Sequence, residues 1–295
     1  MGRAGYAQAV NDPTMVPVDA NADHATVAGF GAEWSAFDQS GLSDDESTHW
    51  FGRYFSLLDG LTTWHPERAM DVGCGSGRWA RHVAPVVGSL TAVDASPAAL
   101  DVARRNLAGF ANVTCAVASV ADLPVDDDSQ DLVYSLGVLH HVPDTKAAIR
   151  SCAAKVKPGG RLLLYLYYRF DNRPAWFQAL WQLSNAGRRL IARMPFRVKR
   201  RITDLIALTV YWPLARLARL GARRGRDVSA WPLSFYRAAS LYTMRTDALD
   251  RFGTRLEQRF TRPEIDQMMR AAGLTDIAFR EGEPFWCVVG TKPNP

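Results

Sequence analysis

The sequence predicts an α/β fold built on a doubly wound, mostly parallel sheet of seven strands. Short apolar runs alternate with helical segments between residues 65 and 168, which is typical of parallel strands joined by helices. The first apolar run ends in a turn with three glycines at alternate positions, where a strand passes into a helix. A last helix, at 263–272, precedes two short strands, 275–281 and 285–291, that flank a Gly-Glu-Pro turn. The chain of 295 residues is long enough to bury a full core as one elaborated domain.

Five strands are expected in the central part of the chain, with helices between them. Ser96 and Pro97 start one helix as its N-cap and first helical residue. Asp144 starts another helix, which ends before Pro158 and the two glycines that follow it. The expected strands are 67–72, 89–94, 112–117, 131–136 and 161–167, and the expected helices are 77–86, 97–109 and 144–156.

The core spans residues 65–168, and the rest of the chain falls into segments before and after it. Residues 1–28 have no apolar stretch of signal-peptide length, so we expect a flexible tail and a cytoplasmic protein. Aromatic and apolar residues at helical spacing in 29–64 predict an N-terminal helical cap over the ligand-binding end of the sheet. The segment 169–261 is far longer than a crossover between parallel strands needs, so it is expected to be a helical insertion or lid. The core then resumes over 262–295.

Positive charge is concentrated in one part of the chain. The net charge is +5, but residues 188–226 hold twelve basic residues and a single acid, Asp204, so the remainder is acidic. A local basic segment does not mark the whole protein as a nucleic-acid binder. Four interpretations of 188–226 stay open: a solvated face of the insertion, a lid over an apolar, acidic substrate, a dimer surface, and a peripheral contact with an anionic membrane. Four widely separated cysteines predict no disulfide framework and no metal site, which fits a reducing cytosol.

The glycine-rich turn is the most informative feature of the sequence. An apolar run ends in Asp71, and Gly73, Gly75 and Gly77 follow at alternate positions. Glycines there allow backbone N–H groups and a helix N-terminus to approach a polar ligand closely. The nicotinamide fingerprint needs a third glycine three residues after the second, and Arg78 occupies that position. The turn therefore indicates a polar ligand other than a nicotinamide dinucleotide.

Five segments resemble the class I, or Rossmann-like, methyltransferases that depend on S-adenosylmethionine (SAM), and they occur in the family's order. Together they cover roughly residues 65–168, about a third of the chain. The resemblance implies SAM as the cofactor, methyltransferase activity, and a C-terminal antiparallel hairpin on the parallel sheet. The segments are MDVGCGSG (70–77), AVDAS (92–96), DLP (122–124), LHHV (139–142) and KPGGR (157–161).

The resemblance assigns most of the cofactor contacts to the first two segments. Asp71 and the backbone of the three glycines suit the amino-acid tail of SAM, since N–H donors bind its carboxylate and an acid orients its ammonium group. Asp94 lies 23 residues after Asp71, a distance at which an acid commonly binds the two hydroxyls of a ribose. Ala95 follows it and is a further cofactor-site candidate.

The adenine wall is where this chain departs from the family pattern. Relatives often carry an acid that accepts from the adenine amino group, and Ser119 occupies that position here. Either Ser119 substitutes for the acid or Asp122 takes the role. Val120 is expected to pack against the base, and Leu136, at the end of the fourth strand, against the sugar or the methionine chain.

His140 and His141 follow the fourth strand, where the resemblance places the meeting point of acceptor and methyl group. An imidazole is a suitable general base near neutral pH, so one of the two is the candidate catalytic residue for a hydroxyl acceptor. The favoured function is methyl transfer to a small-molecule oxygen or nitrogen nucleophile. Two alternatives remain: an enzyme that transfers or cyclises the aminocarboxypropyl group of SAM and releases methylthioadenosine, and a non-catalytic SAM-binding regulator, at a membrane surface or elsewhere.

Overall fold

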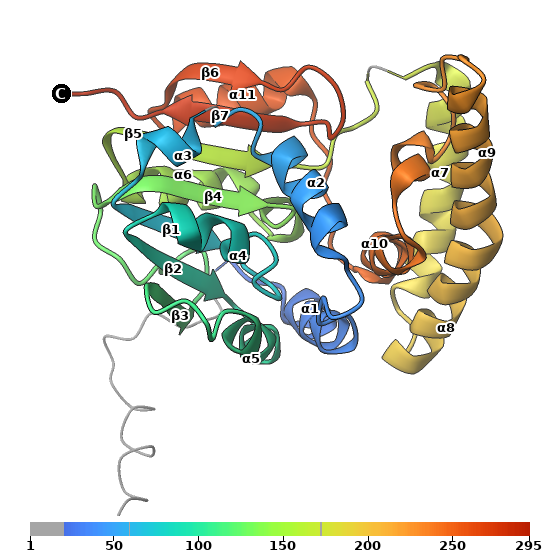
Figure 1. The fold of residues 1–295 in the computed structure, drawn as a ribbon, viewed down its shortest axis with the longest axis horizontal. Helices are drawn as coiled ribbons and strands as arrows, with labels where there is room; N and C mark the ends of the chain where they lie inside the picture. The colour runs from blue at the N-terminus through green and yellow to red at the C-terminus, as the bar shows by residue number, and fades with distance from the viewer. Residues whose placement is uncertain (1–20, 59, 172) are drawn as a thin grey trace, which may run out of the picture.

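The computed structural model describes residues 21–58, 60–171 and 173–295. They form a seven-stranded sheet with the order β3-β2-β1-β4-β5-β7-β6, in which β7 runs antiparallel to both β5 and β6 (Figure 1). This confirms the predicted fold class, including the C-terminal hairpin. The strands are β1 Arg68–Val72, β2 Ser89–Asp94, β3 Val113–Val117, β4 Gln130–Leu136, β5 Val156–Tyr165, β6 Thr275–Phe279 and β7 Cys287–Thr291.

Helices cover both faces of the sheet, as the alternation of strands and helices predicts. One face packs on α6 (Thr145–Lys155) and α11 (Arg262–Ala271), whose buried side chains meet Met70 and Leu164. The other face packs on α4 (Ala80–Val83) and α5 (Pro97–Asn106). Burial on both faces explains why the central strands are largely apolar rather than alternating.

One expected helix is shorter in the structure. The sequence predicts a continuous helix over 77–86, but α4 covers only Ala80–Val83 and is followed by a 3₁₀ turn, Ala84–Val86. Pro85 has no N–H to donate to the carbonyl four residues earlier, so the α-helix ends before it.

The N-terminal cap consists of three helices, and the first begins earlier than expected. Helix α1 spans His24–Ala36, so residues 24–28 are helical and do not belong to the flexible tail expected over 1–28. The Asp23 side chain caps this helix by accepting a hydrogen bond of 2.8 Å from the Thr26 N–H. Residues 1–20 of the expected tail lie outside the described residues. Helices α2 (Asp44–Tyr54) and α3 (Leu61–Trp64) complete the cap.

The helical insertion after β5 lies beyond the carboxyl ends of the parallel strands (Figure 1). Its two ends meet, since Tyr168 and Phe260 pair in a parallel bridge. A third apolar cluster joins it to the cap, with Trp50 of α2 packed among residues of α9, α10 and the π-helical turn. Among the described residues, no helix is both long enough and apolar enough to cross a bilayer. The elements are α7 Ala175–Ile191, α8 Phe196–Ile206, the π turn Ala207–Tyr211, α9 Trp212–Arg223, the 3₁₀ turn Ser234–Ala238 and α10 Leu241–Gly253.

Candidate active site

The glycine-rich turn follows β1 and has a backbone conformation that requires glycine. Gly73, Gly75 and Gly77 have φ of 79°, 54° and 76°, in the left-handed region that other residues rarely adopt. A Cβ on Gly73 would lie 2.4 Å from Val138, and one on Gly75 would lie 2.7 Å from Nε1 of Trp34. The turn is therefore closely covered by α1 and by the segment after β4. Gly73 and Gly75 line the main cavity of the protein, whereas Gly77 packs against α5 and does not.

Asp94, at the end of β2, closes this turn from the neighbouring strand. Its Oδ2 accepts a hydrogen bond of 2.9 Å from Gly75 N–H, and its Oδ1 accepts one of 2.8 Å from Ser96 N–H. Burial raises the pKa of Asp94, and these two N–H donors oppose that rise. A carboxylate has about four lone-pair sites, so each oxygen of Asp94 can accept one more O–H donor from the cavity. That is the capacity a ribose diol needs.

Asp71 lies behind the turn and not on the cavity wall. It is 1% exposed, and its Oδ2 has no hydrogen-bond partner among the described residues. Burial raises its pKa well above the usual range, and the nearby charge of Asp94 adds to the rise. In this arrangement Asp71 therefore does not face the cavity directly.

The residues expected around adenine divide into two groups. Ser119 and Val120 line the cavity, as do Ala95 and Leu136. The Ser119 hydroxyl accepts a hydrogen bond of 3.2 Å from Ala121 N–H, which holds the loop after β3 against the cavity. Asp122 is exposed and lies outside the cavity wall.

One cavity of about 550 Å³ extends from the glycine turn to the helical insertion. Its far wall is aromatic and comes largely from the insertion and from β5. Such walls exclude water and suit an apolar or aromatic ligand. The aromatic residues on this wall include Tyr54, Tyr165, Tyr167, Phe177, Trp181, Tyr211, Phe235 and Tyr236.

The two histidines have different surroundings. His141 lines the cavity, and its Nδ1 lies 2.7 Å from the Leu256 carbonyl oxygen. A carbonyl oxygen only accepts, so Nδ1 carries the proton and Nε2 keeps a lone pair. His140 is fully buried, stacks on Tyr167 with ring centroids 3.8 Å apart, and does not line the cavity. Burial lowers the pKa of His140 well below the usual range, and the neighbouring His141 and Arg259 contribute. The structure therefore places only His141 where a ligand could reach it.

Sequence reasoning missed several charged residues on the cavity wall. Asp247 and Asp250 lie three residues apart on α10, and Glu33 comes from α1. Burial raises the pKa of Asp247 to about 6, and Asp250 adds to this rise. Burial and the charges of the two aspartates also raise the pKa of Glu33 well above its usual range. The i, i+3 spacing on one helix face was the available sequence signal.

The chain resembles known methyltransferases over its central part and beyond. A family model described as "Methyltransferase domain" matches residues 70–164. A "Ubiquinone biosynthesis O-methyltransferase" from Xanthomonas campestris pv. campestris strain B100 is 34% identical over 182 residues, 61% of this chain and 72% of that protein. The chain therefore belongs to the class I SAM-dependent methyltransferase family.

Further comparisons are more partial. A protein of the same name from Xanthomonas euvesicatoria pv. vesicatoria is 39% identical over 129 residues, 43% of this chain and 51% of that protein. The chain thus spans about half the length of that curated relative. A solved structure titled as the N-methyltransferase NodS from Bradyrhizobium japonicum WM9, in complex with S-adenosyl-L-homocysteine (SAH), is 20% identical with a TM-score of 0.43. That match covers 54% of this chain and 78% of the other.

The residues present fit SAM, the cofactor of this family. Gly73 and Gly75 line the cavity, although the N–H groups of Gly73, Cys74, Gly75 and Gly77 are bonded within the protein, and Asp94 retains acceptor capacity for two hydroxyls. Aromatic faces on the far wall suit a sulfonium cation, which they attract through the ring quadrupole. We found no group of three or more His, Cys, Asp or Glu side chains arranged to hold a metal ion in the part of the chain that the structure describes.

Proposed function

We propose that this protein transfers a methyl group from SAM to a hydroxyl group of a small molecule, with His141 as the general base. The observation that carries the proposal is the position of His141. His141 lines the same cavity as the glycine turn and Asp94, and its Nε2 is buried without a hydrogen-bond partner among the described residues, so a small movement of the ring would bring it to an acceptor. SAM supplies an electrophilic methyl group, and the protein has to position and deprotonate the acceptor.

Neighbouring residues hold the His141 imidazole in position. The Leu256 carbonyl fixes its tautomer, and Phe30 packs against the ring with centroids 5.0 Å apart. Asp250 Oδ1 lies 3.7 Å from Nε2, close enough to stabilise the imidazolium ion that forms when the acceptor proton is taken up. Tyr167 in turn donates a hydrogen bond to Asp250.

For the cofactor we propose that Gly73, Gly75 and Asp94 make the main contacts, and that Ser119 and Val120 border the base. Much of the rate acceleration would come from holding acceptor and methyl group close together in a dry cavity. We assign Asp71 the supporting role of shaping the turn.

The deciding experiment measures the products formed from SAM with a panel of phenols, catechols, hydroxy acids and amines. Release of SAH with a methylated acceptor supports the proposal. Methylthioadenosine would indicate aminocarboxypropyl chemistry, and SAM binding without any product would indicate a regulator. His141→Gln should slow turnover by about 10²–10⁴-fold with SAM affinity near that of the wild type. His140→Gln is the matched control, because His140 does not line the cavity.

We also propose that the insertion acts as a lid whose outer face contacts an anionic lipid surface. Large apolar side chains are exposed on α7, α8 and α9, within the basic segment 188–226 and beside it. Leu180 and Trp231 belong to both this exposed face and the cavity wall, so the face continues to the cavity. The exposed residues are Trp176, Leu180, Leu183, Leu190, Val198, Leu205, Leu208, Val210, Trp212, Leu217, Leu220 and Trp231.

Flotation with vesicles of phosphatidylglycerol and phosphatidylcholine tests this contact. Binding should require the anionic lipid and fall with salt, and Leu183→Ser with Leu190→Ser should weaken it. Equal binding to neutral vesicles, or none to either, would contradict the proposal. The acceptor panel would be unaffected by that result, because it uses soluble compounds.

A further inference from the structure

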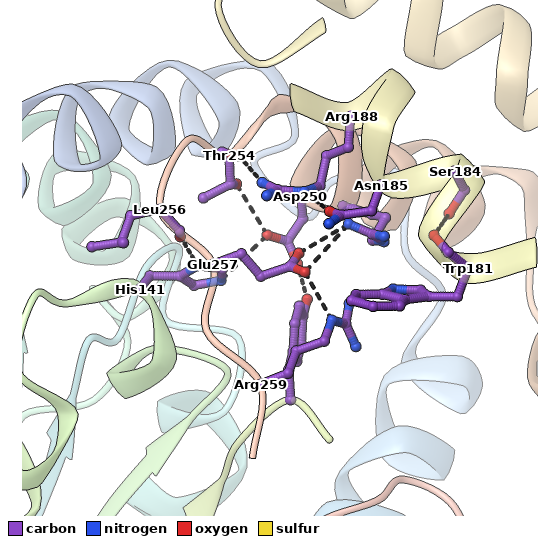
Figure 2. A network of polar contacts seen from close by, with 12 residues as sticks. His141, Trp181, Ser184, Asn185, Arg188, Asp250, Thr254, Leu256, Glu257 and Arg259 are labelled. Atoms are coloured by element: carbon purple, nitrogen blue, oxygen red, sulfur yellow. Dashed lines mark hydrogen bonds and ion pairs between the residues drawn. The ribbon is translucent and has the colours of Figure 1, made fainter. Parts of the chain in front are cut away.

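Three guanidinium groups gather around one buried carboxylate at the insertion side of the cavity. Arg251 Nη1 lies 3.2 Å from Glu257 Oε2, and Arg259 Nε lies 2.8 Å from Glu257 Oε1. Their side chains are 13% and 10% exposed, and that of Glu257 is 2% exposed. Arg188 is the third, bonded through Nη1 to the Thr254 carbonyl at 2.7 Å. Figure 2 shows Arg188, Glu257 and Arg259 converging beside Trp181.

The arginines outnumber the carboxylate that they surround. Arg251 and Arg259 pair with Glu257 and Arg188 also acts on it, while the other acids of the cavity wall, Glu33, Asp247 and Asp250, pair with none of these three arginines. Burial opposes ionisation of Glu257, but the three guanidinium groups outweigh it and lower the pKa of this carboxyl. Burial lowers the pKa of Arg251, Glu257 opposes that change, and the charge of Arg259 adds to it. An uncompensated charge in a partly buried site is costly unless an ion of opposite sign joins it.

Two N–H donors in this group lack acceptors among the described residues. They are Nη2 of Arg251 and Nε1 of Trp181, both shielded from solvent. The Trp181 ring lies 5.2 Å from Arg259 Cζ and 5.8 Å from Arg251 Cζ. Buried donors are normally satisfied, and an unsatisfied one is destabilising. Trp181, Arg251 and Arg259 also line the cavity, so a ligand in the cavity can supply the missing acceptors after small side-chain movements.

We infer that Arg251, Arg259 and Trp181 form a subsite for an oxyanion of the acceptor, either a carboxylate or a phosphate monoester. A guanidinium matches both groups, because its planar fork pairs with two oxygens at once. The aromatic wall around the subsite suits an aromatic or apolar body between the acidic group and the reacting hydroxyl. Tyr167 connects the two ends: its ring centroid lies 5.0 Å from Arg259 Cζ, and its hydroxyl bonds to Asp250 beside His141.

The acceptor class that follows is a hydroxylated acid whose acidic group anchors it while its hydroxyl reaches His141. The hydroxyl part of this statement rests on the proposed function, whereas the oxyanion subsite does not. The subsite can therefore be tested by binding alone, without turnover.

The first test compares four small ligands by ligand-observed NMR titration of the wild-type protein with SAH present. Benzoate should bind about 10- to 100-fold more tightly than benzamide, the range expected when a hydrogen bond to a charged group is lost. Tighter binding of phenyl phosphate than of benzoate would assign the subsite to a phosphate monoester. Equal binding of benzoate and benzamide would overturn the inference. Preference for benzylamine would overturn it too and would point to Glu33, Asp247 and Asp250 as the recognition group.

The second test locates the binding with variants. Trp181→Phe keeps an aromatic side chain and removes the N–H donor. It should weaken benzoate binding about 2- to 10-fold and leave benzamide binding unchanged. Arg251→Lys keeps the charge and loses the fork, so it should reduce the preference for benzoate over benzamide. Arg189→Gln removes an exposed arginine next to Arg188 and should change neither ligand. Unchanged benzoate affinity in both cavity variants would reject the subsite, even if SAH release showed methyl transfer.

Discussion

Nε2 of His141 lies 3.7 Å from Oδ1 of Asp250, while Nδ1 of the same ring is bonded to the Leu256 carbonyl. The ring is therefore fixed at one nitrogen by a neutral acceptor and faces a carboxylate with the other. The relationship joins the loop after β4 to α10 of the insertion, so the insertion completes the reactive end of the cavity.

The first prediction concerns the charge of Asp250. Asp250→Asn keeps the size of the side chain and removes its charge, so the imidazolium of His141 loses stabilisation. We expect kcat/KM with the best acceptor to fall by about tenfold near neutral pH, since a weaker base transfers the proton less readily. Asp266→Asn, on the surface of α11, is the control, and unchanged kcat/KM in Asp250→Asn would argue against the pairing.

The second prediction concerns the cofactor. Asp94→Ala should weaken SAH binding by about 1.5–3 kcal/mol, the range for hydrogen bonds to a charged group. The loss has two sources. One is the set of direct contacts between Asp94 and the cofactor, and the other is the pair of hydrogen bonds by which Asp94 now holds the Gly75 and Ser96 N–H groups. Calorimetric titration measures it, with Asp122→Ala as the comparison, since Asp122 is exposed outside the cavity wall. If Asp122→Ala weakened SAH binding and Asp94→Ala did not, Asp122 would be the cofactor-binding acid instead of Asp94.

The third prediction concerns the contact between the glycine turn and α1. Gly75→Ala places a Cβ 2.7 Å from Nε1 of Trp34, in a backbone with φ of 54°. We expect the free energy of unfolding to fall by about 1–3 kcal/mol, as measured by urea denaturation. Adding Trp34→Ala removes the clash and leaves the backbone strain, so the double variant should lose less than the sum of the two single variants.

Gly109→Ala is the control for that series, because a Cβ there meets nothing within 4 Å. Its free energy of unfolding should stay the same or rise by about 0.4–1 kcal/mol, through lower entropy of the unfolded chain. Strict additivity of Gly75→Ala and Trp34→Ala would show that the two residues do not interact.

The fold was predictable from the sequence because its signals are local. Ser96, Asp144 and the apolar strand runs each act within a few residues, and the structure has helices and strands close to the expected positions. The start of α1 was missed because that helix has little amphipathic pattern and depends on the cap at Asp23 and on packing of Glu33. Pro85 ends α4 early. The proline is visible in the sequence, but the helical pattern of 77–86 still predicted a longer helix.

The candidate site was only partly predictable because its residues come from distant parts of the chain. His140 and His141 are adjacent in sequence, and only the Leu256 carbonyl, 115 positions further on, distinguishes them by fixing one ring at the cavity. Arg251 and Arg259 look like ordinary surface charges until the insertion folds back and buries them beside Glu257. Contacts of this range depend on tertiary packing, which periodicity does not encode.

The last prediction concerns the pH dependence of stability through Asp247. Burial raises its pKa to about 6 from an ordinary value of 3.8, helped by Asp250 and Glu46 and opposed by Arg78 and the hydrogen bond from Tyr236. Between these two pH values the folded protein keeps a proton that the unfolded chain releases, so the free energy of unfolding falls as pH rises from about 4 to about 6. The fall attributable to this group is at most about 3 kcal/mol, since each pKa unit corresponds to about 1.4 kcal/mol.

Asp247→Asn removes this titration, so its free energy of unfolding should fall less than that of the wild type between pH 4 and pH 7. The neutral amide also removes one charge that raises the pKa of Glu33. This too makes the free energy of unfolding of the variant fall less with pH than that of the wild type. Urea denaturation at intervals of half a pH unit measures both slopes, and Asp101→Asn on the surface of α5 serves as the control. Parallel pH curves for the wild type and Asp247→Asn would show that this carboxyl has the same pKa in the folded and unfolded protein.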